Sequence, residues 1–285
     1  MIIAIVGPTG VGKTKLSIEL AKRYNAIIIN ADSMQVYKGL DIGTAKVTEE
    51  EKENIPHYLF DIKEPTEEYS VYDYQKDARK LIEQNKDKNI IFVGGTGLYL
   101  KAALYDYRFS EEETKKDYSN YTDEELYKMV LEKDPNTQIH QNNRVRLERF
   151  LNKELLTHPK PVKLYEHKLI GLTTDRDNLY NIINHRVDIM IENGLLEEIN
   201  SLKKYYNKSR ILNSGIGYKE FSDYLFNNKD INDVIEEIKQ NSRRFAKRQY
   251  TFFKHQFDTN WFNVDLNNFD NTVKEVYTFI KDKET

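Results

Sequence analysis

Residues 2–14 read IIAIVGPTGVGKT, and this stretch decides the fold of the amino-terminal part of the chain. It opens with an uninterrupted apolar run, which is typical of a strand buried on both faces of a parallel sheet. The residues that follow match the pattern GxxxxGK[ST], in which backbone N–H groups wrap around an anion at the start of a helix. We therefore expect a phosphate-binding loop at Gly7–Thr14, between a strand at 2–6 and a helix at 13–24.

The rest of the chain continues the alternation of strand and helix. Apolar runs predict further strands at 26–30, 89–93 and 168–172, and a short one from 261. Amphipathic spacing predicts helices at 70–85 with a Ser70 cap, from 98, at 122–133, over most of 177–257, and finally before 283. The repeated order of strand and helix predicts an α/β fold, a P-loop NTPase-like parallel sheet flanked by helices, with a helical insertion domain.

The most charged stretch begins near residue 109 and interrupts this alternation, which predicts surface helices outside the main core. The expected parts are a core at 1–108 and 137–175, a small helical insertion at 109–136, a mainly helical region at 176–258, and a strand and helix at 259–285 that return to the core. The glycine-containing polar segment 32–46 is expected to be a functional loop with a short helix.

The composition excludes several classes of protein. The chain has 285 residues, no cysteine, and 43 basic against 46 acidic residues, for a net charge of −3. Without cysteine there is no disulfide scaffold, no Cys-ligated zinc, no iron–sulfur cluster and no thiol nucleophile. No apolar run reaches the ~18 residues of a membrane span, and no signal peptide precedes the first strand, so we expect a cytoplasmic protein without membrane association. If RNA is a partner, positive charge must be concentrated locally.

Each part of the phosphate loop has an expected role. Lys13 would reach phosphate oxygens and the Thr14 hydroxyl would hold Mg²⁺. Backbone N–H groups would surround the anion from the preceding residues, Gly7, Pro8, Thr9, Gly10, Val11 and Gly12. The strand at 89–93 is followed by GGTG and not by the aspartate that positions metal for γ-phosphate hydrolysis. The loop therefore fits a diphosphate, but these residues alone leave open a nucleotide-binding kinase that uses ATP and an enzyme with diphosphate as its leaving group.

Asp32 follows the second predicted strand, and Thr96 follows the third. Because the carboxyl ends of parallel strands face the ligand crevice, both side chains are expected to line the same crevice as the phosphate loop. A carboxylate there is able to orient or deprotonate an acceptor group. The alternative is that Asp32 only caps a following turn.

Longer blocks carry a resemblance that spans nearly the whole chain. These blocks are GPTGVGKT at 7–14, DSMQVYKGLDIGTAK at 32–46, PHYLFDI at 56–62, YSVYDY at 69–74, VGGTGLYLKA at 93–102, DPNTQIHQNN at 134–143, GLTTDRDNLYNIINHRVDIMIENGLLEE at 171–198, GIGYKEF at 215–221 and RRFAKRQYTFF at 243–253. In this order they resemble the tRNA dimethylallyltransferase family, also called IPP transferases. Gly10-Val11 stands where the family commonly has Ala-Ser, and the segment RVRLERF after Asn143 is shortened.

The resemblance implies transfer of a dimethylallyl group from dimethylallyl diphosphate to the exocyclic amine of the adenosine 3′ of the anticodon in tRNA. It implies that Asp32 is the general base, that Lys13 and Mg²⁺ on Thr14 neutralise the leaving diphosphate, and that Thr96 contacts tRNA beside the reaction channel. Contacts to the target base and its neighbours are implied for Ser33, Met34 and Gln35. Lys219 is implied as a further diphosphate ligand, although a surface lysine fits its position almost as well.

Two groups of basic residues are candidates for tRNA contact. They are Arg243, Arg244, Lys247 and Arg248 on one predicted helix, and Arg144, Arg146 and Arg149 on another. Solvated helix faces are the alternative for both. We expect a monomer that binds the anticodon stem-loop and draws the adenosine out of its stack. An adenylate prenyltransferase, a small-molecule kinase and a non-enzymatic RNA-binding nucleotide switch remain as rival functions.

Overall fold

The structure is a computed structural model, and it describes residues 1–107, 116–152 and 162–282. The chain divides into two compact units. The main unit combines Met1–Tyr105 with Lys163–Thr285, and the smaller unit is Asp106–Val162.

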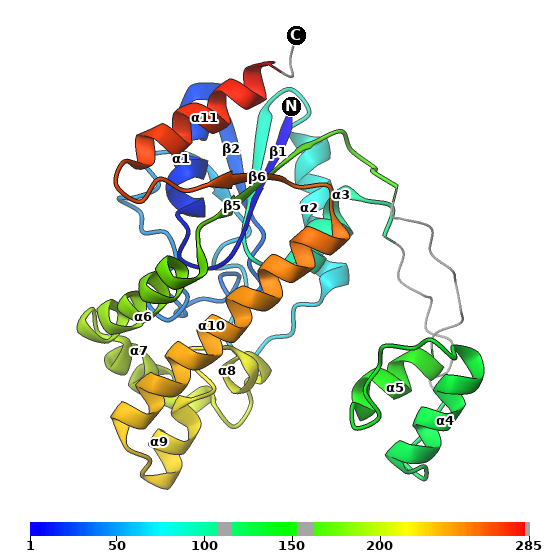
Figure 1. Ribbon diagram of the computed structural model, residues 1–285. Coiled ribbons are helices and arrows are strands. Elements are labelled where there is room, and N and C mark those ends of the chain that lie inside the picture. The colour runs from blue at the N-terminus through cyan, green and yellow to red at the C-terminus, as the bar shows by residue number, and fades with distance from the viewer. Residues whose placement is uncertain (108–115, 153–161, 283–285) are drawn as a thin grey trace. The chain divides into compact units, whose positions relative to one another are not determined.

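A six-stranded parallel sheet forms the centre of the main unit (Figure 1). In chain order its strands are β1 (Ile2–Val6), β2 (Ala26–Asn30), β3 (His57–Tyr58), β4 (Asn89–Val93), β5 (Lys168–Thr173) and β6 (Asn260–Asn263). The spatial order is β3-β2-β4-β1-β5-β6, so β1 lies inside the sheet with β4 and β5 as neighbours. The loops that follow β1, β2 and β4 therefore emerge side by side at the carboxyl edge, where open α/β sheets bind ligands.

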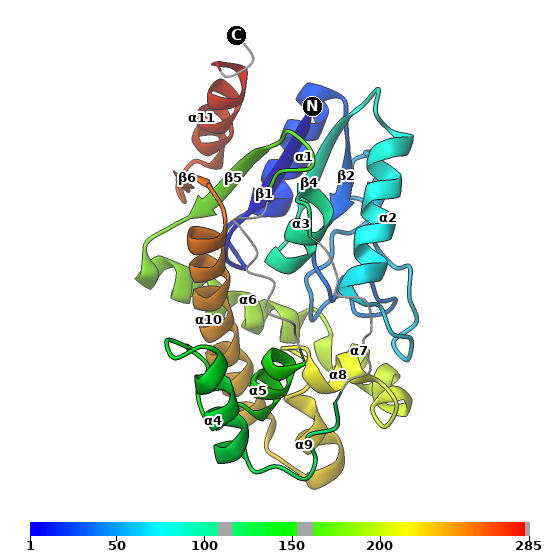
Figure 2. The same cartoon turned by 90° about the vertical axis from the view of Figure 1, so that its right-hand side faces the viewer.

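Helices cover both faces of this sheet (Figure 2). The described helices of the main unit are α1 (Lys13–Tyr24), α2 (Val71–Gln84), α3 (Gly97–Leu104), α6 (Arg176–Glu192), α7 (Leu195–Leu202), the 3-10 turn η1 (Lys203–Tyr205), α8 (Arg210–Ser214), α9 (Phe221–Asn227), α10 (Ile231–Gln256) and α11 (Phe269–Asp282), and α1, α2, α3 and α11 pack on the sheet. Side chains of β1 alternate between two buried clusters: Ile3 and Ile5 pack with α1 and α11, and Ala4 and Val6 with α2 and α3. This alternation follows from the two-residue period of a strand.

Helices α6 to α9 form a group beyond the carboxyl edge of the sheet, and α10 runs from this group back to the sheet (Figures 1 and 2). The α10 helix has 26 residues, which is long enough to connect the two regions. Among the described residues, no helix combines the length and the apolar character needed to cross a membrane. The site at the carboxyl edge is thus enclosed by helices that come late in the sequence.

The smaller unit contains α4 (Asp123–Lys133) and α5 (Arg144–Leu151). Leu126 and Val130 of α4 pack against Leu147 and Leu151 of α5, and all four are buried. The predicted return to the core at 137 is therefore wrong, because α5 shares its apolar face with α4 and belongs to this unit up to Val162. The predicted start of the insertion at 109 lies outside the described residues.

The predicted strands and the predicted α/β class are confirmed, and Ser70 caps α2 as expected, with its hydroxyl accepting from the Asp73 N–H. Two local expectations differ. Segment 32–46 contains turns and no helix. Its backbone N–H groups at Asp41, Ile42 and Gly43 donate to the Glu198 carboxylate of α7, which replaces the hydrogen bonds of a helix. The strand β3 has only two residues, too few to leave a periodic pattern.

Removing the Leu126 side chain should unfold the smaller unit alone. Leu126 is fully buried in a cluster of four buried residues, so Leu126→Ala should cost about 2–5 kcal/mol there. Amide hydrogen exchange should accelerate in α4 and α5 and stay unchanged in β1 and β4. Equal loss of protection in both units would contradict their independence.

Candidate functional site

The phosphate loop joins β1 to α1 in a conformation that requires glycine. Gly7 has φ +138°, and a Cβ placed there would lie 2.3 Å from the Leu172 carbonyl oxygen of β5. Any larger residue would push the loop away from the sheet. Gly12, with φ +87°, precedes the first turn of α1, so the helix N-terminus faces the loop as the sequence predicts.

Lys13 folds back onto its own loop. Its Nζ donates to the carbonyl oxygens of Gly7 at 3.0 Å and Pro8 at 2.7 Å. Burial, together with the nearby Arg186 cation, lowers the pKa of Lys13 to about 7, while the Asp32 carboxylate acts in the opposite direction. The lysine is therefore poised to gain a proton when an anion enters the loop.

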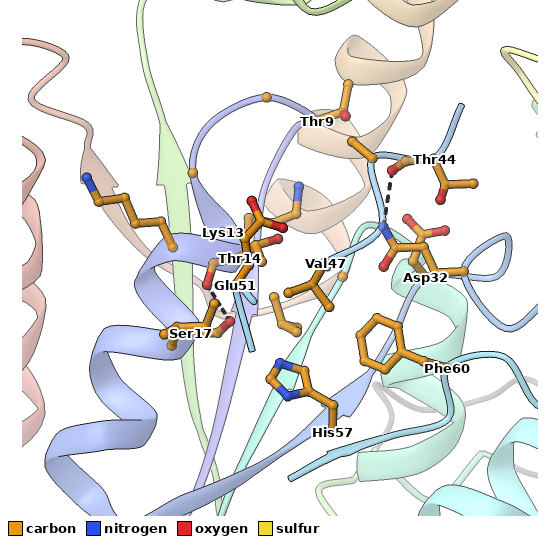
Figure 3. A pocket seen from close by; sticks show the side chains of 18 of the residues that line it. Thr9, Lys13, Thr14, Ser17, Asp32, Thr44, Val47, Glu51, His57 and Phe60 are labelled. Atoms are coloured by element: carbon orange, nitrogen blue, oxygen red, sulfur yellow. Dashed lines mark hydrogen bonds between the residues drawn. The ribbon is translucent and has the colours of Figure 1, made fainter. Parts of the chain in front are cut away.

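A cavity of about 520 Å³ opens beside this loop. Figure 3 shows Lys13 and Thr14 on its wall, with Asp32 across from them and His57 and Phe60 at another edge. The lower part of the wall near His57 is partly apolar, and burial lowers the pKa of that imidazole below its usual value. The cavity thus joins an anion-binding end to a less polar end.

Asp32 is held in place by Asn30, a fully buried side chain at the end of β2. The Asn30 Oδ1 accepts from the Asp32 N–H at 2.8 Å, and its Nδ2 donates to the Asp32 and Leu59 carbonyl oxygens at 3.0 and 2.9 Å. The Asp32 Oδ1 in turn accepts from the Met34 N–H at 3.0 Å. One carboxylate oxygen therefore caps the turn, as the alternative interpretation predicted, and the other is not part of that cap.

Thr96 joins the loop after β4 to the loop after β2. Its Oγ1 accepts from the Ser33 N–H at 3.0 Å and donates to the Ser33 Oγ at 3.2 Å, and its own N–H donates to the Ala31 carbonyl at 3.0 Å. Thr96 therefore joins the loop that carries Asp32 to the loop after β4.

A second cavity, of about 310 Å³, adjoins the first. Residues that line both cavities are Thr9, Asp32, Thr44 and Arg186. Ser33, Met34 and Thr96 line the second cavity, whereas Gln35 lines the first and donates to the Thr44 carbonyl. Asp32 therefore lies where the two cavities meet.

Lys219 lines the second cavity and not the first. The family resemblance had implied it as a diphosphate ligand. It follows the turn Gly215–Gly217, which faces the helical region. Its Nζ is 3.9 Å from the Glu220 carboxylate and its side chain is well exposed.

Arg186 of α6 is a site residue that the sequence analysis missed. Its Nη1 donates to the Thr9 hydroxyl at 2.8 Å and its Nη2 to the Thr44 carbonyl at 3.1 Å. Burial lowers the pKa of Arg186, and the charge of Asp32 opposes this. The sequence pattern that could have identified Arg186 is its spacing from apolar residues. It lies between the buried Ile183 and Val187, on the core-facing side of the helix.

The basic residues of α10 differ in their surroundings. Arg244, Lys247 and Arg248 are exposed, and Arg248 lines the second cavity. Arg243 donates to the Asn184 side chain and lies over the Tyr180 ring, so it also links α10 to α6.

The second basic group belongs to the smaller unit. Arg144 donates to the carbonyl oxygens of Tyr118 and Tyr121 and pairs with Asp123 and Glu148, so its guanidinium holds α5 against the residues around the start of α4. Arg146 is exposed, and Arg149 lies within α5.

Comparisons with known proteins show which family the chain is similar to. Residues 35–256 match the family model described as IPP transferase. A tRNA dimethylallyltransferase from Anoxybacillus flavithermus is 44% identical, with 99% of this chain and 96% of the relative covered. The crystal structure of a tRNA isopentenylpyrophosphate transferase from Bacillus halodurans is 41% identical, covers 99% of this chain and 96% of its own, and gives a TM-score of 0.78. A eukaryotic dimethylallyltransferase acting on tRNA is 30% identical over 99% of this chain and 79% of its own, with a TM-score of 0.83.

Removing the Asn30 amide should destabilise the fold more than removing an exposed one. Asn30→Ala leaves the Asp32 N–H and the carbonyl groups of Asp32 and Leu59 without this partner, at about 1–3 kcal/mol for each group that stays dry. Chemical denaturation measures the loss, with Asn181→Ala on the exposed side of α6 as the matched control. Equal unfolding free energies for the two variants would contradict this role.

Binding of inorganic diphosphate should take up a proton at Lys13. The pKa of Lys13 is about 7, and a bound anion should raise it. The affinity for diphosphate should therefore fall by up to about tenfold per pH unit above pH 7. Calorimetry in buffers with different ionisation enthalpies measures the uptake. Diphosphate itself also titrates, and it does so equally with the Lys13→Met variant. The difference in proton uptake between the wild-type protein and this variant therefore reports on Lys13. Identical pH slopes would refute the assignment.

Proposed function

The chain belongs to the IPP transferase family, and we propose on that basis that it is a tRNA dimethylallyltransferase. It transfers a dimethylallyl group from dimethylallyl diphosphate to the exocyclic amine of the adenosine 3′ of the anticodon and releases diphosphate. The observation that carries this proposal is the position of Asp32 between the phosphate-loop cavity and the second cavity. A donor in one cavity and an acceptor in the other would meet at this carboxylate.

The phosphate loop would bind the leaving group. Backbone N–H groups, the helix N-terminus and the ammonium of Lys13 would stabilise negative charge as the allylic C–O bond breaks and its electron pair moves to the diphosphate. Arg186 would support this charge from the shared wall and keep Thr9 in place. The GGTG sequence after β4 fits a reaction in which no γ-phosphate is hydrolysed.

Magnesium fits this arrangement as a partner of the diphosphate. Thr14 is the residue we assign to it, since its side chain lines the cavity at the start of α1. The described residues contain no group of three His, Asp or Glu side chains able to hold a metal by themselves, so substrate oxygens and water would complete the shell. Bound there, Mg²⁺ would neutralise charge on the leaving diphosphate.

Asp32 would act on the acceptor. The adenine amine attacks the allylic carbon, a C–N bond forms, and one amine proton moves to the carboxylate. Because Oδ1 is occupied by the Met34 N–H, we assign the other oxygen as the base. Asn30 supports the assignment, because its hydrogen bonds fix the backbone of Asp32 and so help to set the position of the carboxylate.

The second cavity would receive the flipped adenosine, and the exposed cations beside it would meet the tRNA backbone. Ser33, Met34 and Thr96 line this cavity, which fits their proposed contacts with the base. Arg248 and Lys219 also line it, which makes Lys219 a better candidate for RNA phosphate than for diphosphate. We also propose that the protein acts as a monomer in the cytoplasm.

The decisive experiment is transfer with purified protein, dimethylallyl diphosphate and unmodified tRNA, followed by nucleoside analysis. Asp32→Asn removes the base while keeping the shape, so turnover should fall by about 10²–10⁴-fold, with tRNA affinity nearly unchanged. Asp270→Asn on the exposed face of α11 is the matched control and should retain full turnover. Full activity of Asp32→Asn would exclude Asp32 as the base.

The same assay separates the rival functions. Prenylation of AMP without prenylation of tRNA would identify an adenylate prenyltransferase. Consumption of ATP in place of dimethylallyl diphosphate would identify a kinase.

A further inference from the structure

Gln249 is a buried polar side chain in the carboxyl-terminal half of α10, with 5% of its surface exposed. Its Oε1 accepts from the Thr9 N–H at 3.1 Å, and its Nε2 donates to the Gly95 carbonyl at 3.1 Å. A single amide therefore bridges the loop after β1 and the loop after β4. It lines neither of the two cavities, so it would not touch a substrate in them.

The loop after β4 is shaped around this amide. A Cβ built on Gly95 would lie 2.0 Å from the Gln249 Nε2, and the next neighbour outside that side chain is the Asp32 Oδ2 at 3.6 Å. Gly95 is thus kept free of a side chain chiefly by Gln249. The two residues are packed so closely that a larger side chain at either position would clash with the other residue.

Both loops held by Gln249 lead directly to groups of the reaction. Thr9 belongs to the phosphate loop, and its hydroxyl accepts a hydrogen bond from Arg186. Gly95 precedes Thr96, whose hydroxyl fixes Ser33 beside Asp32. The amide of Gln249 therefore sits between the proposed leaving-group site and the proposed acceptor site, joined to each through one loop.

We propose that Gln249 is a positioning residue for the transfer, which sets the separation between the phosphate loop and the Asp32–Thr96 pair. This inference rests on the proposed function. In a displacement, the leaving oxygen, the allylic carbon and the amine nitrogen must lie in line, and a shift of about 1 Å lowers the rate about 10²-fold. An amide suits the task because it offers one acceptor and one donor on a short rigid group.

The first test replaces the amide with an apolar group of similar length. Gln249→Met loses both hydrogen bonds, so the single-turnover rate at saturating substrates should fall about 10–100-fold, with the KM of each substrate changed less than about threefold. Rates are normalised to sites titrated with tRNA, so that unfolded protein does not count. Val234→Ala, a buried change far along α10, is the matched control for lost stability and should keep the wild-type rate per site.

The second test uses the contact with Gly95. Gly95→Ala alone should lower the rate because its Cβ meets the Gln249 amide, whereas in a Gln249→Ala background the same methyl group has room. The double variant should therefore equal Gln249→Ala in rate, which is complete coupling in a double-mutant cycle.

The results distinguish the two proposals. If Gln249→Met matches Val234→Ala in rate per site, or if the Gly95 and Gln249 effects simply multiply, Gln249 is a structural residue and the inference fails. If the wild-type protein transfers no dimethylallyl group to tRNA, the proposed function fails first.

Discussion

Two cationic side chains, Lys13 and Arg186, line the phosphate-loop cavity together with the Asp32 carboxylate, and the organisation of the site follows from this. Burial lowers the pKa of both Lys13 and Arg186, and the Arg186 charge adds to the effect at Lys13, while the Asp32 charge opposes both shifts. A bound anion would remove this imbalance, since the most favourable partner for two buried cations is a multiply charged ligand. Holding these two cations close together therefore has an electrostatic cost that the surrounding fold must offset.

The fold carries this cost with uncharged groups. Asn30 fixes the backbone of Asp32, Thr96 joins two loops, and Gln249 joins two more. Amides and hydroxyls supply both a donor and an acceptor, so they satisfy buried backbone groups without adding a charge to a region that already holds three. Glu198 plays a comparable part at the edge of the site, where its carboxylate accepts three backbone N–H groups of segment 32–46.

Sequence patterns predicted the structural features that depend only on residues close together in the chain. The apolar runs of the strands, the glycine spacing of the phosphate loop and the positions of Asp32 and Thr96 after their strands all follow from short segments. Arg186, Asn30 and Gln249 were missed because their functions arise from contacts between distant segments, as in the bond between Thr9 and Gln249, which are 240 positions apart. Arg144 was predicted only as a tRNA contact from a basic run, which gave no sign of the partners that its guanidinium has within its own unit.

The central place of β1 has a consequence for how the protein is made. This strand is synthesised before the other five strands of the sheet, yet one of its two neighbours is β5, and the loop at its end is held by α10. While the ribosome is producing the first hundred residues, β1 has an open edge and its phosphate loop has no support from α6 or α10. Pairings between such distant segments form slowly, because a long loop must close before they stabilise the chain. The nascent chain therefore carries an open apolar strand edge until β5 has emerged, and assembly of the anion site waits further, until α10 has been made.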